Sequence, residues 1–245
     1  MDGLLLLNKP LQWTSHDAVD FLRRKLGQKK IGHAGTLDPM ATGLLVLLLG
    51  KATKLSAEMT GLDKDYRGSI RLGVVTDSWD LEGKVLSEKP VTDVSRAQTE
   101  KAVTELRGPQ SITPPAFSAL KKEGKRYYAM AREGLMLEPP AREVMIADFG
   151  VEDFVSPEIF FFVSCSKGTY VRSLAYLVGQ KLGCGACLSS LIRTRIGDYS
   201  LENALTVSQI DKLSLEEVEK RIKKTTPRLE LDEHDATGLL GEQQD

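Results

Sequence analysis

The sequence has few of the residues on which metal, redox and cofactor sites depend. It holds three cysteines and three histidines in 245 residues. A structural zinc site normally takes four ligands, and the one closely spaced pair, Cys184 and Cys187, supplies only two. The chain has no GxGxxG dinucleotide fingerprint and no complete P-loop. We therefore expect no metal, no cofactor and no disulfide framework.

Long apolar runs are also missing. The longest aliphatic run, Leu44–Leu49, falls far short of the roughly 20 residues that a membrane helix needs. The short apolar stretch near the N-terminus follows no basic segment, which argues against a secretory signal. We therefore expect a cytoplasmic protein that does not contact a membrane.

The composition is that of a folded globular protein, with 41% hydrophobic and 27% charged residues. Expected strands, such as 3–8 and 44–49, alternate irregularly with expected helices, such as 15–26 and 170–182. This mixture without strict βαβ order favours an α+β domain whose central sheet is mixed and mostly antiparallel, flanked by helices and loops.

The net charge of −1 hides an uneven distribution. Residues 229–245 contain six acids and no Lys or Arg, so the rest of the chain has 33 basic and 28 acidic residues, a net of +5. Charges more than about 8 Å apart are largely screened from one another. Three basic clusters, at 23–30, at 121–126 and at Arg193 with Arg195, are therefore either solvated faces or contacts to nucleic acid.

The most unusual segment is the glycine-punctuated stretch from Gly32 to Gly43, which we expect to be a loop. Pro39 favours an extended backbone at Asp38, and the loop precedes a very apolar strand. A carboxylate held in this way could act as a nucleophile or base. An ordinary Asp-Pro turn is the alternative.

Two more segments contain residues suited to chemistry. Tyr66 begins a predicted strand, where its ring could stack on a base or simply pack at the strand edge. Gly168 and Thr169 precede a predicted helix, so backbone amides and Arg172 could bind an anion. A surface salt bridge would explain Arg172 equally well.

Together these segments resemble one family, the bacterial tRNA pseudouridine-55 synthases, or TruB family. The resemblance covers roughly residues 3 to 210. The matching motifs occur in the family's order, and their combination is far more specific than any one of them. They are Asn8-Lys9-Pro10 with Thr14-Ser15, Gly35-Thr36-Leu37-Asp38-Pro39 with Ala41 and Gly43, Lys64-Asp65-Tyr66, and Gly168-Thr169-Tyr170-Val171-Arg172-Ser173-Leu174.

The resemblance implies a pseudouridine synthase fold, a reaction and a set of roles. The reaction would isomerise uridine 55 in the T-loop of tRNA after the base is flipped out, without a cofactor. Asp38 would be the essential carboxylate, attacking C6 or C1′ or acting through a glycal-like intermediate. Tyr66 would stack on the uracil and help remove the C5 proton, and Arg172 would hold Asp38 charged. Four further residues would contact the substrate or neighbour the site: His33, Tyr170, Leu191 and Lys9.

The chain departs from the family pattern in two places. Gln12 stands where the family usually has glycine, which would cost about 1 kcal/mol if that position needs a positive φ. About 35 residues follow Ile210, too few for the family's additional RNA-binding PUA domain. We expect a catalytic domain at 1–210 and a short extension at 211–245 with an acidic tail and no PUA domain.

The expected partner is the T-arm of tRNA. The resemblance also implies a monomer with no obligate protein partner. Two other functions remain open. One is a tRNA-binding or tRNA-folding protein without catalysis. The other is a nucleotide hydrolase that uses Gly50-Lys51 to bind phosphate.

Overall fold

The computed structural model describes residues 1–118, 121–122, 125–127, 130, 135, 137 and 139–224. Its centre is a 10-stranded sheet in the order β14-β1-β3-β12-β4-β11-β10-β7, with β2 paired to β3 and β13 paired to β12. The strands of this sheet are β1 (Gly3–Lys9), β2 (Ile31–Ala34), β3 (Ala41–Leu49), β4 (Lys64–Leu72), β7 (Gly108–Ile112), β10 (Arg142–Val155), β11 (Glu158–Cys165), β12 (Ala186–Ile196), β13 (Tyr199–Ser200) and β14 (Leu205–Thr206).

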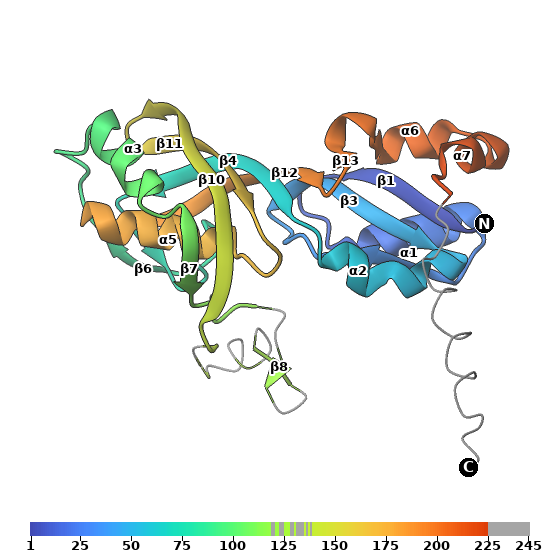
Figure 1. Ribbon diagram of the computed structural model, residues 1–245, viewed down its shortest axis with the longest axis horizontal. Helices are drawn as coiled ribbons and strands as arrows, with labels where there is room; N and C mark the ends of the chain where they lie inside the picture. The colour runs from blue at the N-terminus through green and yellow to red at the C-terminus, as the bar shows by residue number, and fades with distance from the viewer. Residues whose placement is uncertain are drawn as a thin grey trace, which may run out of the picture.

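Two small hairpins and the helices complete the described fold (Figure 1). The hairpins pair β5 (Val74–Thr76) with β6 (Val85–Glu88) and β8 (Lys121–Lys122) with β9 (Lys125–Arg126). The helices are α1 (Ser15–Leu26), the 3-10 helix η1 (Gly50–Leu55), α2 (Ser56–Thr60), α3 (Arg96–Thr104), α5 (Val171–Leu182), the 3-10 helix η2 (Leu201–Asn203), α6 (Val207–Lys212) and α7 (Leu215–Arg221).

The pairing in the central sheet confirms the expected α+β class. β1 with β14 and β3 with β12 are parallel, and the other pairs are antiparallel. The parallel contact of β3 with β12 joins the two halves of the molecule, and β4 and β12 run between them (Figure 1).

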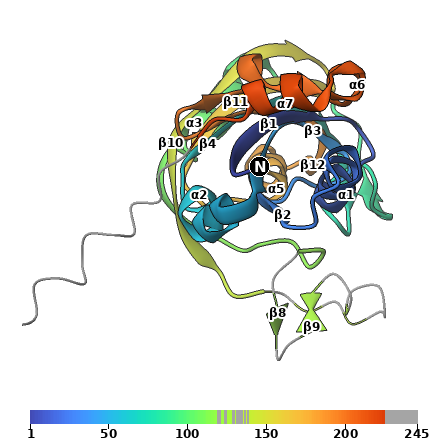
Figure 2. The same cartoon turned by 90° about the vertical axis from the view of Figure 1, so that its right-hand side faces the viewer.

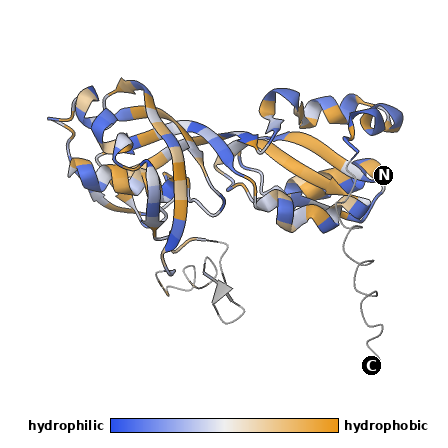
Figure 3. Ribbon diagram, viewed as in Figure 1, coloured by the Kyte–Doolittle hydropathy of each residue, from blue (hydrophilic) through white to orange (hydrophobic). Residues whose placement is uncertain are grey.

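The N-terminal half is built on two leucine-rich strands, β1 and β3, which are buried on both faces (Figure 3). One face packs against α1 and the α6–α7 segment, and the other packs against η1 and α2 (Figure 2). Burial on both faces explains why these strands lack the polar–apolar alternation of a half-exposed strand. Helix α1 begins as expected, because Thr14 and Asp17 form a reciprocal capping box.

The other half packs α3 and α5 against one face of β4, β11, β10 and β12. Alternate residues of β11, including Ile159, Phe161 and Val163, point into this core. Both halves therefore have their own apolar core, and the strands that join them lie between the two.

The described part of the expected extension packs on the N-terminal half. Ile210 and Val218 are fully buried, and the amide of Lys223 donates to the carbonyl of Leu4 at 2.8 Å. The expected boundary at residue 210 thus falls inside α6. The acidic stretch 229–245 and most of a helix expected at 127–132 lie outside the described residues.

Two local expectations are corrected. Residues Ile31–Ala34, expected mainly as loop, form β2, because their backbone pairs with β3 in register from Leu49 to Val46. The helix expected from Lys51 begins as a 3-10 helix before α2. In the described parts of the chain, no helix is long and apolar enough to span a membrane.

Candidate active site

The Asp38 loop, residues 35–40, connects β2 to β3 at the junction of the two halves. Ser15, at the start of α1, binds it through Leu37: the Ser15 hydroxyl donates to the carbonyl at 3.2 Å and accepts from the amide at 2.8 Å. Leu37 and Met40 are buried in the core beside it. The side chain of Asp38 keeps 40% of its surface exposed. The backbone of the loop is therefore held by Ser15 and by the buried side chains of Leu37 and Met40, while the Asp38 carboxylate stays accessible to solvent.

Arg172, on the first turn of α5, contacts this carboxylate. Its Nη2 lies 3.0 Å from Oδ2 of Asp38, and only 6% of its side chain is exposed. The same guanidinium donates to the carbonyls of Ser78, at 3.0 Å, and Phe117, at 2.9 Å. A buried guanidinium with fixed partners has one orientation, so the Asp38–Arg172 pair predicted from the sequence is present and geometrically defined.

Asp80 is a second carboxylate that contacts Arg172, and the sequence did not indicate it. Its Oδ2 lies 3.4 Å from Nη1 of Arg172, and the residue is 4% exposed. Its other oxygen accepts from the Ser78 hydroxyl at 2.6 Å and from the Glu82 amide at 3.1 Å. In the sequence Asp80 lies in what looks like an ordinary turn, Ser78-Trp79-Asp80-Leu81-Glu82. Only its contact with Arg172 in the folded protein places it in the site.

Arg193 is another residue of the site, although in the sequence it stood out only as part of a basic cluster. It is 1% exposed, and its guanidinium donates to the carbonyls of Leu44 at 2.8 Å, Gly35 at 3.0 Å and Thr36 at 3.3 Å. It therefore holds the Asp38 loop to β12. The expectation that Arg193 and Arg195 form a free basic patch is wrong, because Arg195 in turn pairs with Asp65.

Two buried lysines lie on either side of the loop. Lys9 is fully buried and donates to the carbonyls of Trp13 at 2.6 Å, Pro10 at 2.9 Å and Pro39 at 3.5 Å. Lys64 donates to the carbonyls of Thr60 and Leu62. Burial lowers the pKa of each lysine to about 8. The Nζ atom of Lys9 faces backbone oxygens, so its contribution to the site is support of the loop.

Tyr66 and Leu191 form an apolar wall beside the loop. Both belong to the same buried cluster as Leu37, and they project from the adjacent strands β4 and β12. Burial raises the pKa of the Tyr66 phenol to about 12, although the neighbouring Arg193 opposes this shift. Tyr66 is therefore a neutral aromatic face at physiological pH. This suits stacking on a planar, uncharged ring.

His33 and Tyr170 are the two remaining predicted site residues, and both are partly buried. His33 belongs to β2, and its Nδ1 is buried without a hydrogen-bond partner among the described residues. Burial, with Arg193 and His16 nearby, lowers the pKa of His33, so its imidazole is neutral. Tyr170 is the N-cap residue of α5, two positions before Arg172, and burial raises its pKa. The structure thus places all seven predicted site residues around one loop.

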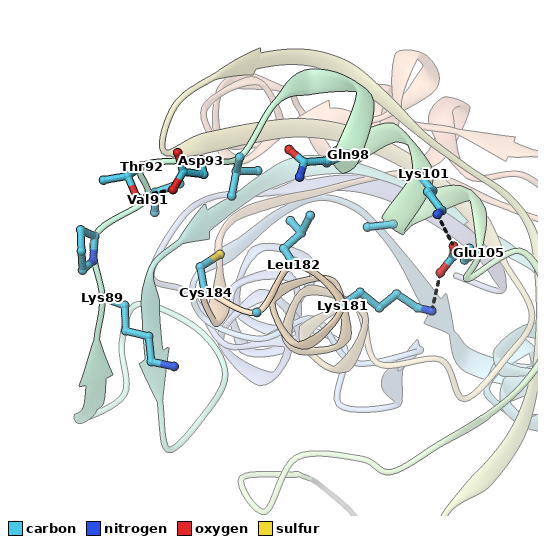
Figure 4. Close-up of a pocket in the computed structure, with 14 residues that line it drawn as sticks. Lys89, Val91, Thr92, Asp93, Gln98, Lys101, Glu105, Lys181, Leu182 and Cys184 are labelled. Atoms are coloured by element: carbon cyan, nitrogen blue, oxygen red, sulfur yellow. Dashed lines mark hydrogen bonds and ion pairs between the residues drawn. The ribbon is translucent and has the colours of Figure 1, made fainter.

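Two other places that could bind ligands lie apart from this loop. A groove of about 690 Å³ between α3, the end of α5 and residues 89–94 contains none of the predicted site residues (Figure 4). At Gly50-Lys51, the Asp2 carboxylate already accepts from the Lys51 amide at 2.6 Å. An acceptor there occupies the position a phosphate would need, so the nucleotide hydrolase alternative loses its binding site.

The arrangement offers a carboxylate held by a buried arginine, with a neutral aromatic ring at its side. The described residues contain no group of three or more His, Cys, Asp or Glu placed to hold a metal ion. Cys165, Cys184 and Cys187 are all free thiols, and Cys184 is the partly exposed one. Carboxylate chemistry on a planar substrate is what these residues can supply.

Comparisons with known proteins identify the family. Residues 23–171 match the family described as TruB family pseudouridylate synthase (N terminal domain). Proteins named tRNA pseudouridine synthase B are similar over most of the chain. The one from Opitutus terrae is 49% identical over 91% of this chain and 92% of its own length. The one from Ralstonia pickettii is 43% identical over 97% of this chain and 78% of its own length.

Solved structures give the same assignment of fold. A chain in an H/ACA RNP bound to a substrate RNA containing 2′-deoxyuridine superposes with a TM-score of 0.65 and 26% identity. One in a Cbf5-Nop10-Gar1 complex gives 0.65 and 27%. Both matches cover 85% of this chain, which spans about half the length of those chains (52% and 54%). Sequence, fold and site geometry agree, and the chain belongs to the TruB family of pseudouridylate synthases.

Proposed function

We propose that this protein converts uridine to pseudouridine in tRNA, at position 55 of the T-loop. The single observation that supports this best is the half-exposed carboxylate of Asp38, held at 3.0 Å by the buried Arg172. Its relatives are named tRNA pseudouridine synthase B, which supports tRNA as the substrate. A protein that only binds RNA has no need to hold a carboxylate where phosphates approach, since the charges repel.

The reaction breaks the C1′–N1 bond of the uridine, turns the uracil and joins its C5 to C1′. The proton on C5 is lost and N1 gains one, so the atoms balance without a cofactor. Asp38 supplies the negative charge that either bonds to the nucleoside or stabilises it as the C1′–N1 bond breaks. The buried guanidinium of Arg172 holds this carboxylate in place at 3.0 Å.

Tyr66 would bind the target base, and His33 would fill the space that the base leaves in the T-loop. A uridine inside a folded T-loop must be flipped out, at a cost of a few kcal/mol. The neutral ring of Tyr66 would stack on the uracil against Leu191. A phenol with a pKa of about 12 cannot accept the C5 proton until its own proton leaves, so burial favours stacking as the role of Tyr66. The neutral, half-buried imidazole of His33 would stack in the gap.

The test is pseudouridine formation in an unmodified T-arm stem-loop, followed by mass spectrometry after chemical labelling. Wild type, Asp38→Asn and a matched surface variant, Asp198→Asn, would be compared at equal concentration. We expect product from wild type and Asp198→Asn, and none from Asp38→Asn despite unchanged RNA affinity. Product from Asp38→Asn would identify a different essential group. No product from folded wild type, on this RNA or on full-length tRNA, would favour the non-catalytic binding protein.

A further inference from the structure

The backbone is strained at two described residues other than glycine. These are Gln12, with φ of 65°, and Trp79, with φ of 62°. A bulky L-residue is strained in this left-handed region and persists there only where surrounding contacts hold it. Both lie beside the Asp38–Arg172 pair. The amide of Gln12 donates to the carbonyl of Pro39 at 2.8 Å, and Trp79 lies between Ser78 and Asp80.

The strained turn at Trp79 directs both of its neighbours at one guanidinium. The carbonyl of Ser78 accepts from Nη1 of Arg172 at 3.0 Å, and the carboxylate of Asp80 lies 3.4 Å from the same atom. In an extended strand the backbone carbonyls lie roughly perpendicular to the side chains, so a carbonyl and a side chain point in different directions. With the left-handed conformation at Trp79, the carbonyl of Ser78 and the carboxylate of Asp80 both reach the same nitrogen.

The side chain of Trp79 makes a second contact between this turn and α5. Its ring stacks on the ring of Tyr176, with centroids 4.5 Å apart and planes 13° from parallel. Tyr176 follows Arg172 by four residues in α5, so the two side chains lie one above the other on the same face of the helix. Three consecutive loop residues therefore contact two successive turns of α5, and the aromatic stack is the part that does not involve Arg172.

The backbone of Trp79 is fixed on its other side by β12. Its carbonyl accepts from the amide of Leu188 at 2.9 Å, and the amide of Leu81 donates to the carbonyl of Leu188 at 3.1 Å. The amide of Trp79 also donates to the carbonyl of Thr76 at 3.4 Å, and the Thr76 hydroxyl donates to the carbonyl of Asp80 at 2.6 Å. These backbone bonds set where the turn lies, and the ring adds the contact between the turn and Tyr176 of α5. Nε of Arg172 has no hydrogen-bond partner among the described residues, so the orientation of the guanidinium depends on its two Nη atoms.

We propose that Trp79 is a positioning residue for the reaction, and that its stack on Tyr176 keeps Arg172 aligned with Asp38. The proposal rests on the proposed function, because alignment of Arg172 matters to catalysis only if Asp38 performs it. Trp79 would act on the rate of the chemical step and not on RNA affinity.

The experiment compares variants that keep or remove the flat ring. Trp79→Phe and Tyr176→Phe keep it, Trp79→Leu and Tyr176→Leu remove it, and Phe160→Leu is the matched control on the outer face of β11. The single-turnover rate on the T-arm stem-loop and the affinity for the pseudouridine-containing product would both be measured. An aromatic pair contributes enough for about a tenfold effect.

We expect both leucine variants to lower the rate about tenfold with affinity within about twofold of wild type, and the phenylalanine variants to stay within about threefold. The double leucine variant should lose no more than either single one, because the two rings act as one unit. A wild-type rate in Trp79→Leu, multiplicative losses in the double variant, or a loss of affinity at a retained saturating rate would each overturn the proposal. The last result would make Trp79 a direct RNA contact.

A glycine variant separates alignment from folding. Trp79→Gly fits the positive φ without strain and should fold at least as well as the leucine variant, yet it lacks the ring. We expect it to be slow as well. A full rate in Trp79→Gly would show that the turn alone is sufficient and would overturn the role of the stack.

A readout in the free protein keeps this test independent of the proposed function. In ¹⁵N-arginine NMR spectra, the Arg172 signal is identified by its loss in Arg172→Lys. Its exchange protection should fall in Trp79→Leu and survive in Trp79→Phe. Unchanged protection in Trp79→Leu would overturn the proposal even if wild type formed no pseudouridine. Product from wild type and Phe160→Leu with unaffected Trp79 variants would overturn only the proposal about Trp79.

Discussion

Nη1 of Arg172 lies 3.4 Å from Oδ2 of Asp80, so the guanidinium that holds Asp38 faces a second, buried carboxylate. Asp80 is 4% exposed and sits on a different loop from Asp38. One cation between two carboxylates is attracted from both sides. Its position along the line between them then depends on both partners.

Replacing Asp80 by asparagine tests this balance. Asp80→Asn keeps the size of the side chain but removes the negative charge that Arg172 faces, and close charge pairs couple by about 1.5 kcal/mol or more. If this energy serves to align Arg172, the single-turnover rate should fall about tenfold to a hundredfold with RNA affinity unchanged. Asp198→Asn, on the exposed turn after β12, is the control. A rate equal to wild type would mean that Asp80 only helps the loop to fold.

The two arginines of β12 should differ sharply in their effect on stability. Arg193 is buried and donates to three carbonyls, including those of Gly35 and Thr36, whereas Arg195 is partly exposed and pairs with Asp65. Arg193→Met leaves these carbonyls buried without donors, at about 1–3 kcal/mol each. We expect a loss of at least about 3 kcal/mol in the free energy of urea unfolding.

Arg195→Met is the matched comparison, with an expected loss of about 1 kcal/mol or less because exposed ion pairs contribute little. Equal losses in the two variants would show that Arg193 does not hold the Asp38 loop. Because both residues lie on the same strand two positions apart, general disturbance of β12 would affect them alike.

Lys9 and Lys64, the two lysines beside the loop, should titrate near pH 8. Burial lowers the pKa of Lys9 and Lys64 to about 8, whereas an unfolded lysine titrates near 10.5. Between these values the unfolded chain binds more protons than the native protein, so the stability that these groups contribute rises with pH from about 8 to about 10.5. It is lost as the pH falls from about 10.5 to about 8 and changes little below that, because both states are then protonated.

NMR of ¹³C-labelled lysine side chains measures this directly. We expect two lysine signals with midpoints near pH 8, one of which disappears in Lys9→Met and the other in Lys64→Met. Lys51→Met, which changes an exposed lysine of η1, is the control and should leave both signals near pH 8 in place. A spectrum in which no lysine signal has a midpoint near pH 8 would show that burial does not lower the pKa of Lys9 and Lys64.

Much of the fold and site could be predicted because its signals are local. Thr14 and Asp17 predict the start of α1 through a capping box that needs only neighbours in the sequence. Asp38, Tyr66 and Arg172 each stand in a short motif, so the resemblance placed them in one site before any contact was known. In the structure Arg172 contacts Asp38, and Tyr66 packs in the same buried cluster as Leu37 of the Asp38 loop.

The supporting residues could not be predicted, because they depend on contacts distant in the sequence. Arg193 reaches Gly35 only because β12 runs parallel to β3 in one register, with Leu191 opposite Ala41. In the sequence it looked like one of two surface arginines. β2 was hidden for a similar reason: its glycine suggested a loop, and only pairing with β3 makes it a strand.

The unusual glutamine at position 12 gives the last prediction. Its φ of 65° confirms that this position needs a left-handed backbone, where most L-residues lose about 1–2 kcal/mol. Gln12→Gly relieves this strain but adds about 0.4–1 kcal/mol of chain entropy to the unfolded state. It also removes an exposed hydrogen bond of 3.1 Å from Nε2 to Glu82, which contributes little. We expect a net gain of about 0.5 kcal/mol in urea unfolding.

The backbone bond from Gln12 to the carbonyl of Pro39 survives in every variant, so the rate of the reaction should stay within about twofold of wild type. Gln12→Ala supplies the control, because it keeps the strain and loses the same side-chain bond. Gln12→Asn should fall between them, since asparagine tolerates the left-handed region better than most residues. The order of stability should therefore be glycine, asparagine, then alanine. If alanine proved as stable as glycine, the backbone strain at position 12 would be too small to offset the entropy that glycine adds to the unfolded chain.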